Sequence, residues 1–168
     1  MTSTHLERKV EIVNFGLIVT SDSVSKGLKK DEITPMVVDL LGRTRHKLAF
    51  HKVVPNDEVA IRDAISEALG KVDVVIVTGG TGPNPKRDKT INIVCEFNGV
   101  ELPGFGELFR YLSFKEIGAR AWLSRAIALV VNGKLLIALP GSPHAVRLAL
   151  EKLILPVIGH AIAEIRGY

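Results

Sequence analysis

A short apolar segment that runs directly into a glycine-rich turn constrains the fold of this chain more than any other feature. Residues 72–77 read Val-Asp-Val-Val-Ile-Val, and such a β-branched run is typical of a buried strand in a parallel sheet. The turn Thr78-Gly79-Gly80-Thr81-Gly82 follows at once. Glycines allow positive φ and let successive N–H groups point at one place, so the turn predicts an anion-binding loop. An ordinary tight turn is the alternative.

Alternating strand and helix patterns precede this segment. Residues 13–20 and 48–54 are apolar enough to form two further strands. Between them, residues 31–41 place apolar side chains at the 3.6-residue spacing of a helix. A second helix is expected before residue 72, with Asn56 as its N-cap. The order strand-helix-strand-helix-strand implies a parallel sheet with right-handed crossovers.

The second half of the chain predicts an antiparallel strand in the same sheet. Two apolar runs, residues 126–131 and 134–139, flank Asn132-Gly133. This dipeptide is typical of a two-residue hairpin, because both central residues of a type I′ turn need positive φ. A helix is expected to begin at Pro103, and another to follow the hairpin with Ser142 as its N-cap.

The bulk composition describes one globular domain. The chain has 168 residues, 46% of them hydrophobic and 24% charged, and we expect a tail over residues 1–12 and one domain over residues 13–168. Its net charge of +4 suits a small anionic ligand and does not predict nucleic-acid binding. Cys95 is the single cysteine, and its apolar neighbours predict a buried structural thiol. Without a secretory signal or a membrane-spanning stretch, a cytoplasmic protein is expected.

Polar and glycine-bearing segments follow three of the predicted strands. Ser21-Asp22 follows the first, residues 78–82 the third, and Pro140-Gly141-Ser142 the last. Ligands of open α/β sheets bind beyond the carboxyl ends of the strands, so we expect these segments to line one phosphate-binding crevice. The helix after the last segment adds free N–H groups and a positive dipole end. Arg87 and Asp88 can supply a fixed positive charge and a metal ligand.

Several familiar nucleotide and metal sites are excluded. The sequence lacks the Gly-x-x-x-x-Gly-Lys-Ser/Thr motif of P-loop NTPases, the glycine spacing of dinucleotide-binding folds and the Gly-x-Ser-x-Gly elbow of hydrolases. It also lacks CxxC and HExxH motifs. The residues alone therefore predict phosphate or nucleotide chemistry with a metal that the ligand brings in.

Five motifs in one order resemble a known family. They are Ser21-Asp22, the Thr78 to Gly82 loop with Arg87-Asp88-x-Thr90, Pro103-Gly104-Phe105-Gly106-Glu107, Leu123-Ser124-Arg125 and Leu139-Pro140-Gly141-Ser142-Pro143. From residue 15 to 165 the chain resembles the molybdenum cofactor biosynthesis protein B and molybdopterin adenylyltransferase family, which includes the gephyrin and plant G domains. The resemblance implies a three-layer α/β/α sandwich, with a mostly parallel mixed sheet and one antiparallel hairpin strand, assembled as a homotrimer or homohexamer.

The resemblance also implies a reaction. AMP would pass from Mg²⁺-bound ATP to the terminal phosphate of molybdopterin, in preparation for insertion of molybdenum or tungsten. On the family's pattern Asp88 would hold or orient Mg²⁺. The substrates would be bound by Ser21, Asp22, the Thr78 to Gly82 loop, Gly104, Ser124, Arg125 and the Pro140 to Ser142 loop.

Two departures from the family's pattern keep an alternative open. Active members have Pro-Asp before the second helix, whereas this chain has Pro55-Asn56-Asp57, so that Asp57 joins Arg87 and Asp88 as a catalytic candidate. The stretch between Gly82 and Arg87 is also one residue longer. A non-catalytic relative that binds the pterin, or serves as a scaffold, is the alternative hypothesis. Individual motifs also have plainer interpretations: a turn cap at Ser21-Asp22, a helix start at Pro103 and a surface pair at Ser124-Arg125.

Overall fold

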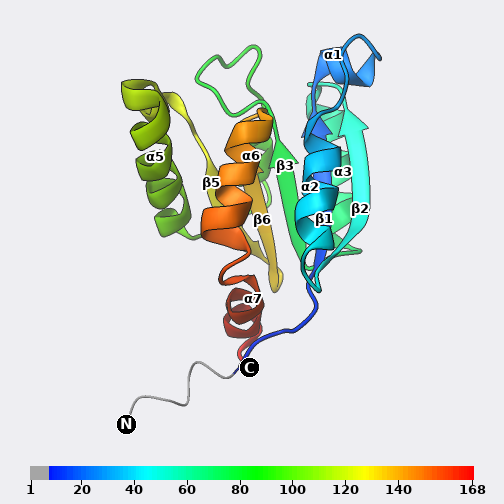
Figure 1. Ribbon diagram of the computed structural model, residues 1–168. Helices are drawn as coiled ribbons and strands as arrows, with labels where there is room; N and C mark the ends of the chain where they lie inside the picture. The colour runs from blue at the N-terminus through cyan, green and yellow to red at the C-terminus, as the bar shows by residue number, and fades with distance from the viewer. Residues whose placement is uncertain (1–7) are drawn as a thin grey trace.

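Helices cover both faces of a six-stranded sheet in the computed structural model, which describes residues 8–168 (Figure 1). The strands are β1 (Asn14–Thr20), β2 (Lys47–Val54), β3 (Val74–Thr78), β4 (Val100–Glu101), β5 (Ile127–Val131) and β6 (Lys134–Leu139). Their order across the sheet is β2-β1-β3-β6-β5-β4. β5 is antiparallel to β6 and β4, and the other pairs are parallel. The predicted mixed sheet with one reversed strand is therefore confirmed.

The helices form the two outer layers of the sandwich. They are α1 (Asp22–Ser25), α2 (Ile33–Gly42), α3 (Glu58–Leu69), α4 (Thr90–Cys95), α5 (Pro103–Ile117), the 3₁₀ helix η1 (Gly118–Leu123), α6 (Pro143–Ala149), the π-helical turn η2 (Leu150–Ile154) and α7 (Ile158–Arg166). One layer packs α2, α6 and α7 on the sheet, and the other packs α3 and α4. Within residues 8–168, no helix is long and apolar enough to cross a membrane.

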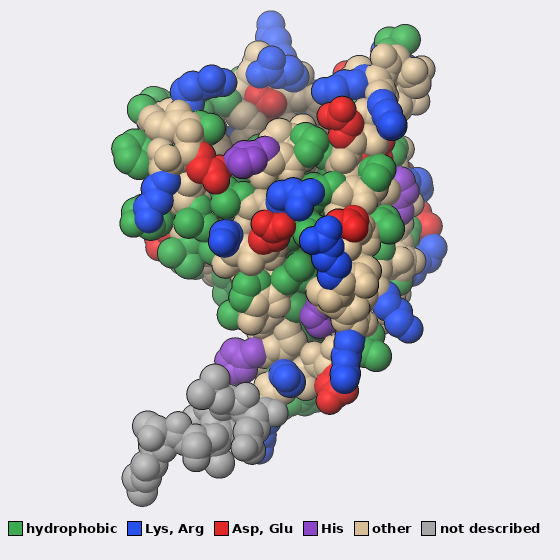
Figure 2. Space-filling view, in the orientation of Figure 1, with side chains coloured by type: hydrophobic (Ala, Val, Ile, Leu, Met, Phe, Trp, Pro, Cys, Tyr) green, Lys and Arg blue, Asp and Glu red, His purple; other side chains and the backbone are tan. Residues whose placement is uncertain are grey.

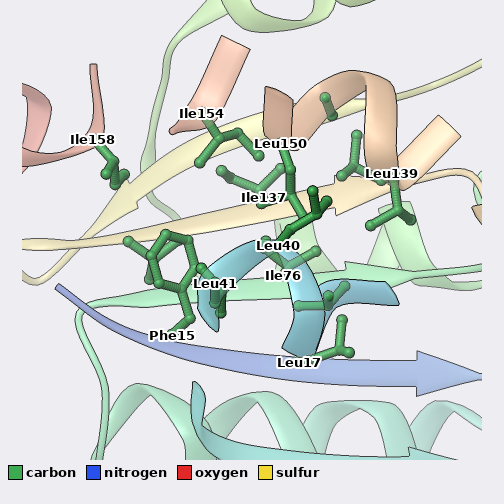
Figure 3. Packing of buried hydrophobic residues seen from close by; sticks show 14 of the residues in the cluster. Phe15, Leu17, Leu40, Leu41, Ile76, Ile137, Leu139, Leu150, Ile154 and Ile158 are labelled. Atoms are coloured by element: carbon green, nitrogen blue, oxygen red, sulfur yellow. The ribbon is translucent and has the colours of Figure 1, made fainter. Parts of the chain in front are cut away.

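The alternation of side chains along β3 divides the core between these two layers. Val74 and Ile76 face α2, α6 and α7, while Val75 and Val77 face α3 and α4. All four are at most 1% exposed, which explains why the segment is apolar throughout. Figure 3 shows the first of the two clusters, where Phe15 and Leu17 of β1 lie beneath the helices.

The termini of the domain are held against the end of the sheet opposite the strand carboxyl ends. The backbone N–H of Val10 donates to the carbonyl of Gly159 in α7 at 2.9 Å. Asp73 accepts the Asn14 N–H at 2.8 Å and pairs with Arg166 of α7. Although burial opposes ionisation of Asp73, these two partners hold the pKa of its carboxyl below the ordinary value. Of the expected 1–12 tail, residues 1–7 lie outside the described residues.

The hairpin and the cap of α6 agree with the sequence analysis. Asn132 and Gly133 have φ values of 49° and 75°, as a type I′ turn requires. Ser142 is the N-cap of α6, where its Oγ accepts the N–H of Ala145 at 3.1 Å, and Pro143 is the first helical residue. Both predictions are confirmed because each depends only on local backbone chemistry.

Two local predictions were wrong. The N-cap of α3 is Asp57, whose carboxylate accepts the N–H of Ala60 at 2.9 Å, and not Asn56. Cys95 is exposed rather than buried, because α4 turns Ile91 and Val94 inward and leaves Cys95 on its outer face. The short elements α1, α4 and β4 were not predicted at all.

Candidate functional site

Three loops meet at the carboxyl ends of the central strands. They follow β1, β3 and β6, which lie next to one another in the sheet. Together with the loop after β2 they line a cavity of about 430 Å³, on which Ser21, Gly80, Asp88 and Gly141 all lie. The expected meeting of these loops at one crevice is therefore confirmed, and its position follows from the parallel topology.

A second cavity of about 380 Å³ adjoins the first one on the side of α5 and α6. Gly80, Asp88 and Gly141 line both cavities, so these residues form the boundary between them. The walls of the second cavity are largely apolar and include Phe109 of α5 and Leu148 of α6. We call the first one the polar cavity and the second one the apolar cavity.

Glycines allow the three loops to approach so closely. Gly79 has φ +105°, and a Cβ there would overlap the carbonyl oxygen of Thr20. A Cβ on Gly141 would lie 3.0 Å from the Cα of Gly79. The Oγ1 of Thr78 donates to the carbonyl of Pro140 at 2.9 Å, which ties the β3 loop to the β6 loop. Side chains at these glycines would separate the loops and open the crevice.

Asp88 is a buried carboxylate at the boundary of the two cavities. It is 7% exposed, and its Oδ2 accepts the N–H of Asn84 at 3.0 Å. The Arg87 guanidinium lies 3.6 Å from the same oxygen. A Cβ on Gly82 would lie 2.6 Å from Oδ2, so the glycine loop wraps tightly around this carboxylate.

Three buried oxygen atoms around the glycine loop have no hydrogen-bond partner within the described part of the chain. They are Thr20 Oγ1, Thr90 Oγ1 and Asn56 Oδ1. A Cβ on Gly80 would lie 2.6 Å from Thr90 Oγ1 and 3.3 Å from Asn56 Oδ1. Buried polar atoms in native proteins are nearly always hydrogen-bonded, so these three oxygens leave hydrogen-bonding capacity unmet beside the glycine loop.

Charged side chains of both signs surround the polar cavity. Lys29, Lys30 and Arg87 are the basic residues of its lining, and Asp22, Asp31, Glu32 and Asp88 are the acidic ones. Figure 2 shows both signs at the upper end of the molecule, over α1 and the loop after β3. No group of three or more acidic, histidine or cysteine side chains that could hold a metal occurs in residues 8–168. The acidic residues of the lining can supply one or two carboxylate ligands to Mg²⁺, and the oxygens of a bound phosphate would supply the others, as is common for this ion.

The structure brings most of the predicted site residues to the two cavities. The polar cavity is lined by Ser21, Asp22, Thr78, Gly79, Gly80, Arg87, Asp88 and Gly141 of this set. The apolar cavity is lined by Thr81, Gly82, Ser124, Pro140 and Ser142. Three others line neither cavity. Asp57 caps α3, Gly104 lies exposed in the first turn of α5, and the Arg125 guanidinium bonds the Asn92 side chain at 3.0 Å.

The sequence analysis missed some of the residues that line the cavities, among them residues from two regions. Lys29 and Lys30 lie in the loop between α1 and α2, where a pair of lysines near the first strand was the available signal. Glu116 of α5 and His144 of α6 pair across the edge of the apolar cavity. No sequence signal identifies this pair, because it depends on how two helices pack.

Comparisons with known proteins agree on one family. Residues 16–160 match the family model described as a probable molybdopterin binding domain. The molybdenum cofactor biosynthesis protein B of Staphylococcus aureus (strain N315) is 50% identical over 119 residues, 70% of each chain. The protein of the same name from Bacillus cereus is 38% identical over 96% of this chain and 95% of its own length. The tungsten cofactor synthesizing protein of Pyrococcus furiosus superposes with a TM-score of 0.85, at 33% identity, over 94% of this chain and 99% of that one.

Proposed function

The chain belongs to the family of probable molybdopterin-binding domains that includes molybdenum cofactor biosynthesis protein B, and we propose that it transfers AMP from ATP to the terminal phosphate of molybdopterin. The observation that carries this proposal is the shared lining of the two cavities by Gly80, Asp88 and Gly141. Such a transfer must bring the phosphates of two large substrates together. Two adjoining cavities with one common boundary suit that requirement.

The chemistry of the transfer needs positioning and charge neutralisation more than a protein nucleophile. An oxygen of the pterin phosphate attacks the α-phosphorus of ATP, the bond to the β-phosphate oxygen breaks, and pyrophosphate leaves. The glycine loop after β3 offers backbone N–H groups to phosphate oxygens. Lys29, Lys30 and Arg87 offer positive charge to the triphosphate and to the leaving pyrophosphate.

The acidic residues of the polar cavity suit a magnesium ion that arrives with ATP. When bound, Mg²⁺ neutralises phosphate charge. Asp88 would hold it, together with Asp22, whose carboxylate lies in the same lining. Both are anionic oxygen ligands, as Mg²⁺ prefers. The buried position of Asp88 strengthens its electrostatic effect on a neighbouring cation.

The apolar cavity suits a flat heterocycle. Phe109, Leu148 and Leu123 contribute apolar surface, and Ser113, Ser124 and Ser142 contribute hydroxyl groups to the same lining. Ligand sites commonly combine such apolar walls with a few polar groups that fix orientation. The pterin and the adenine are both flat rings with polar edges, and the cavity offers apolar walls and hydroxyl groups for either one.

A homo-oligomer, as a trimer or hexamer, is part of the proposal. The surface of α5 and η1 exposes large apolar side chains at Leu108, Tyr111, Phe114, Ile117 and Trp122, each more than half exposed. Exposed apolar patches of this kind mark interaction surfaces. In Figure 1, α5 stands at the edge of the sandwich, where a second copy can approach it. Because the reaction consumes ATP, we also propose that the protein acts in the cytoplasm.

The test is a direct assay of the purified protein with molybdopterin, ATP and Mg²⁺. Adenylylated pterin and pyrophosphate, formed in equal amounts, are the expected products. Binding of the pterin without turnover would instead favour the non-catalytic alternative. One argument favours that alternative: the neutral Asn56 lies on the polar cavity, at the position where the family's pattern has an aspartate.

A further inference from the structure

Asn56 connects three loops of the polar cavity, and we propose that it is a positioning residue for Asp88. Its backbone N–H donates to Oδ1 of Asp22, the first residue of α1 in the segment that follows β1, at 2.8 Å. Its side-chain Nδ2 donates to the carbonyl oxygen of Arg87, in the loop after β3. The inference rests on the proposed function, because it assigns Asn56 a role in placing the carboxylate that would meet the nucleotide.

The bond to Arg87 acts on Asp88 through the peptide that joins the two residues. Within the loop, the N–H groups of Arg87 and Asp88 both donate to the carbonyl of Asn84, at 3.1 and 2.6 Å. Asp88 accepts the N–H of Asn84 in return at 3.0 Å. These bonds close residues 84–88 into a turn but do not fix the turn against the loop after β2. The Asn56 amide supplies that link, and so it sets where the turn presents the Asp88 carboxylate.

The link at position 56 requires a side chain that donates a hydrogen bond, as the asparagine amide does. A carboxylate has the same shape but accepts hydrogen bonds only, so it would turn an oxygen toward the Arg87 carbonyl. It would also add negative charge between the carboxylates of Asp22 and Asp88, with the Arg87 guanidinium as the nearby cation. The other amide atom, Oδ1, is buried against Gly80 without a hydrogen-bond partner among the described residues. Its surroundings therefore offer no donor to the second oxygen of a carboxylate. We therefore expect Asn56→Asp to impair the site rather than improve it.

Hydrogen exchange provides the structural readout. In Asn56→Asp and in Asn56→Ala, the amides of Asn84 and residues 86–88 should exchange roughly tenfold faster than in the wild type, as the loss of one hydrogen bond predicts. Exchange within α3 should not change. The matched control is Asn98→Asp, which makes the same charge change at an exposed position outside both cavities. Unchanged exchange at Asn84 and residues 86–88 in both variants would overturn the inference.

Kinetics separate positioning from a general loss of stability. Asn56→Asp should raise KM for Mg·ATP by roughly tenfold and lower kcat, with KM for molybdopterin little changed, because the disturbed turn lies on the polar cavity. A gain of activity in Asn56→Asp would show that a carboxylate is preferred there and would refute the inference. If wild type makes no adenylylated product, the proposed function fails, and the exchange experiment still decides whether Asn56 holds the turn.

Discussion

Replacing Asp88 by Asn removes one charge from the boundary between the two cavities and changes little else. The carboxylate is 7% exposed, so water screens it weakly and its charge acts strongly on a bound cation or phosphate. Removing one preorganised electrostatic group from an active site costs about 10²–10³-fold in turnover. We therefore expect kcat of Asp88→Asn to fall by about 10²-fold or more.

The same substitution should alter stability only slightly. An asparagine carbonyl oxygen can still accept the N–H of Asn84, which Asp88 accepts at 3.0 Å. The ion pair with Arg87 spans 3.6 Å to a guanidinium that is 73% exposed, and pairs of that kind contribute about 0–1 kcal/mol. Adding the weakening of a charge-assisted hydrogen bond, we expect a loss of about 1 kcal/mol in the free energy of unfolding.

Turnover and stability are measured on the same preparations, by release of pyrophosphate at saturating Mg²⁺ and by urea unfolding. The comparison variant is Asp57→Asn, which changes the other carboxylate that the sequence analysis considered. Asn is as good an N-cap as Asp, and Asp57 lines neither cavity, so this variant should keep its activity. The assignment would be refuted if Asp88→Asn retained full turnover, or if Asp57→Asn lost as much.

Three further outcomes are expected. Asp73→Asn should lower the free energy of unfolding, measured by calorimetry, by about 1–3 kcal/mol. Because the pKa of Asp73 is lowered in the folded state, its carboxylate stabilises the wild type above about pH 4, and this stabilisation is lost as the pH falls further. The variant should lack that part of the acid sensitivity. Gly79→Ala should lower the free energy of unfolding in urea by about 3 kcal/mol or more, because the added Cβ would overlap the Thr20 carbonyl oxygen. Gly27 also has a positive φ but lies in open space, so Gly27→Ala should lower it by about 1 kcal/mol. Trp122→Ser, on the exposed surface of η1, should lower the mass seen in sedimentation, and a monomeric wild type would contradict the oligomer.

The arrangement of the sheet could be predicted because its signals are local and repeated. β1, β3, β5 and β6 each carry an apolar run, the hairpin carries Asn132-Gly133, and parallel connections have one hand. Those rules bring the loops after β1, β3 and β6 to one edge before any side-chain contact is known. β4 was not predicted, because a strand of two residues, Val100–Glu101, is too short to show an alternation of apolar and polar side chains.

One local error came from neighbouring residues with equal propensities. Asn56 and Asp57 are both good N-caps, and only the backbone decides between them: Asp57 is extended, with φ −119° and ψ 135°, and its side chain accepts the Ala60 N–H. The side chain of Asn56 is thereby free to reach Arg87. Propensity could rank the two residues equally but could not show which one faced the crevice.

The apolar cavity could not be predicted because it depends on packing between distant parts of the chain. Its lining combines the glycine loop with Phe109 of α5 and Leu148 of α6, two apolar helical residues that periodicity alone does not place at a cavity. Whether an inward side chain fills the core or borders a cavity is decided by the spacing of the helices over the sheet. Phe109 does both, since it is 1% exposed and belongs to the hydrophobic core while also bordering the cavity. A motif can therefore locate the phosphate-binding edge of this site, whereas the apolar surface beside it follows only from the tertiary structure.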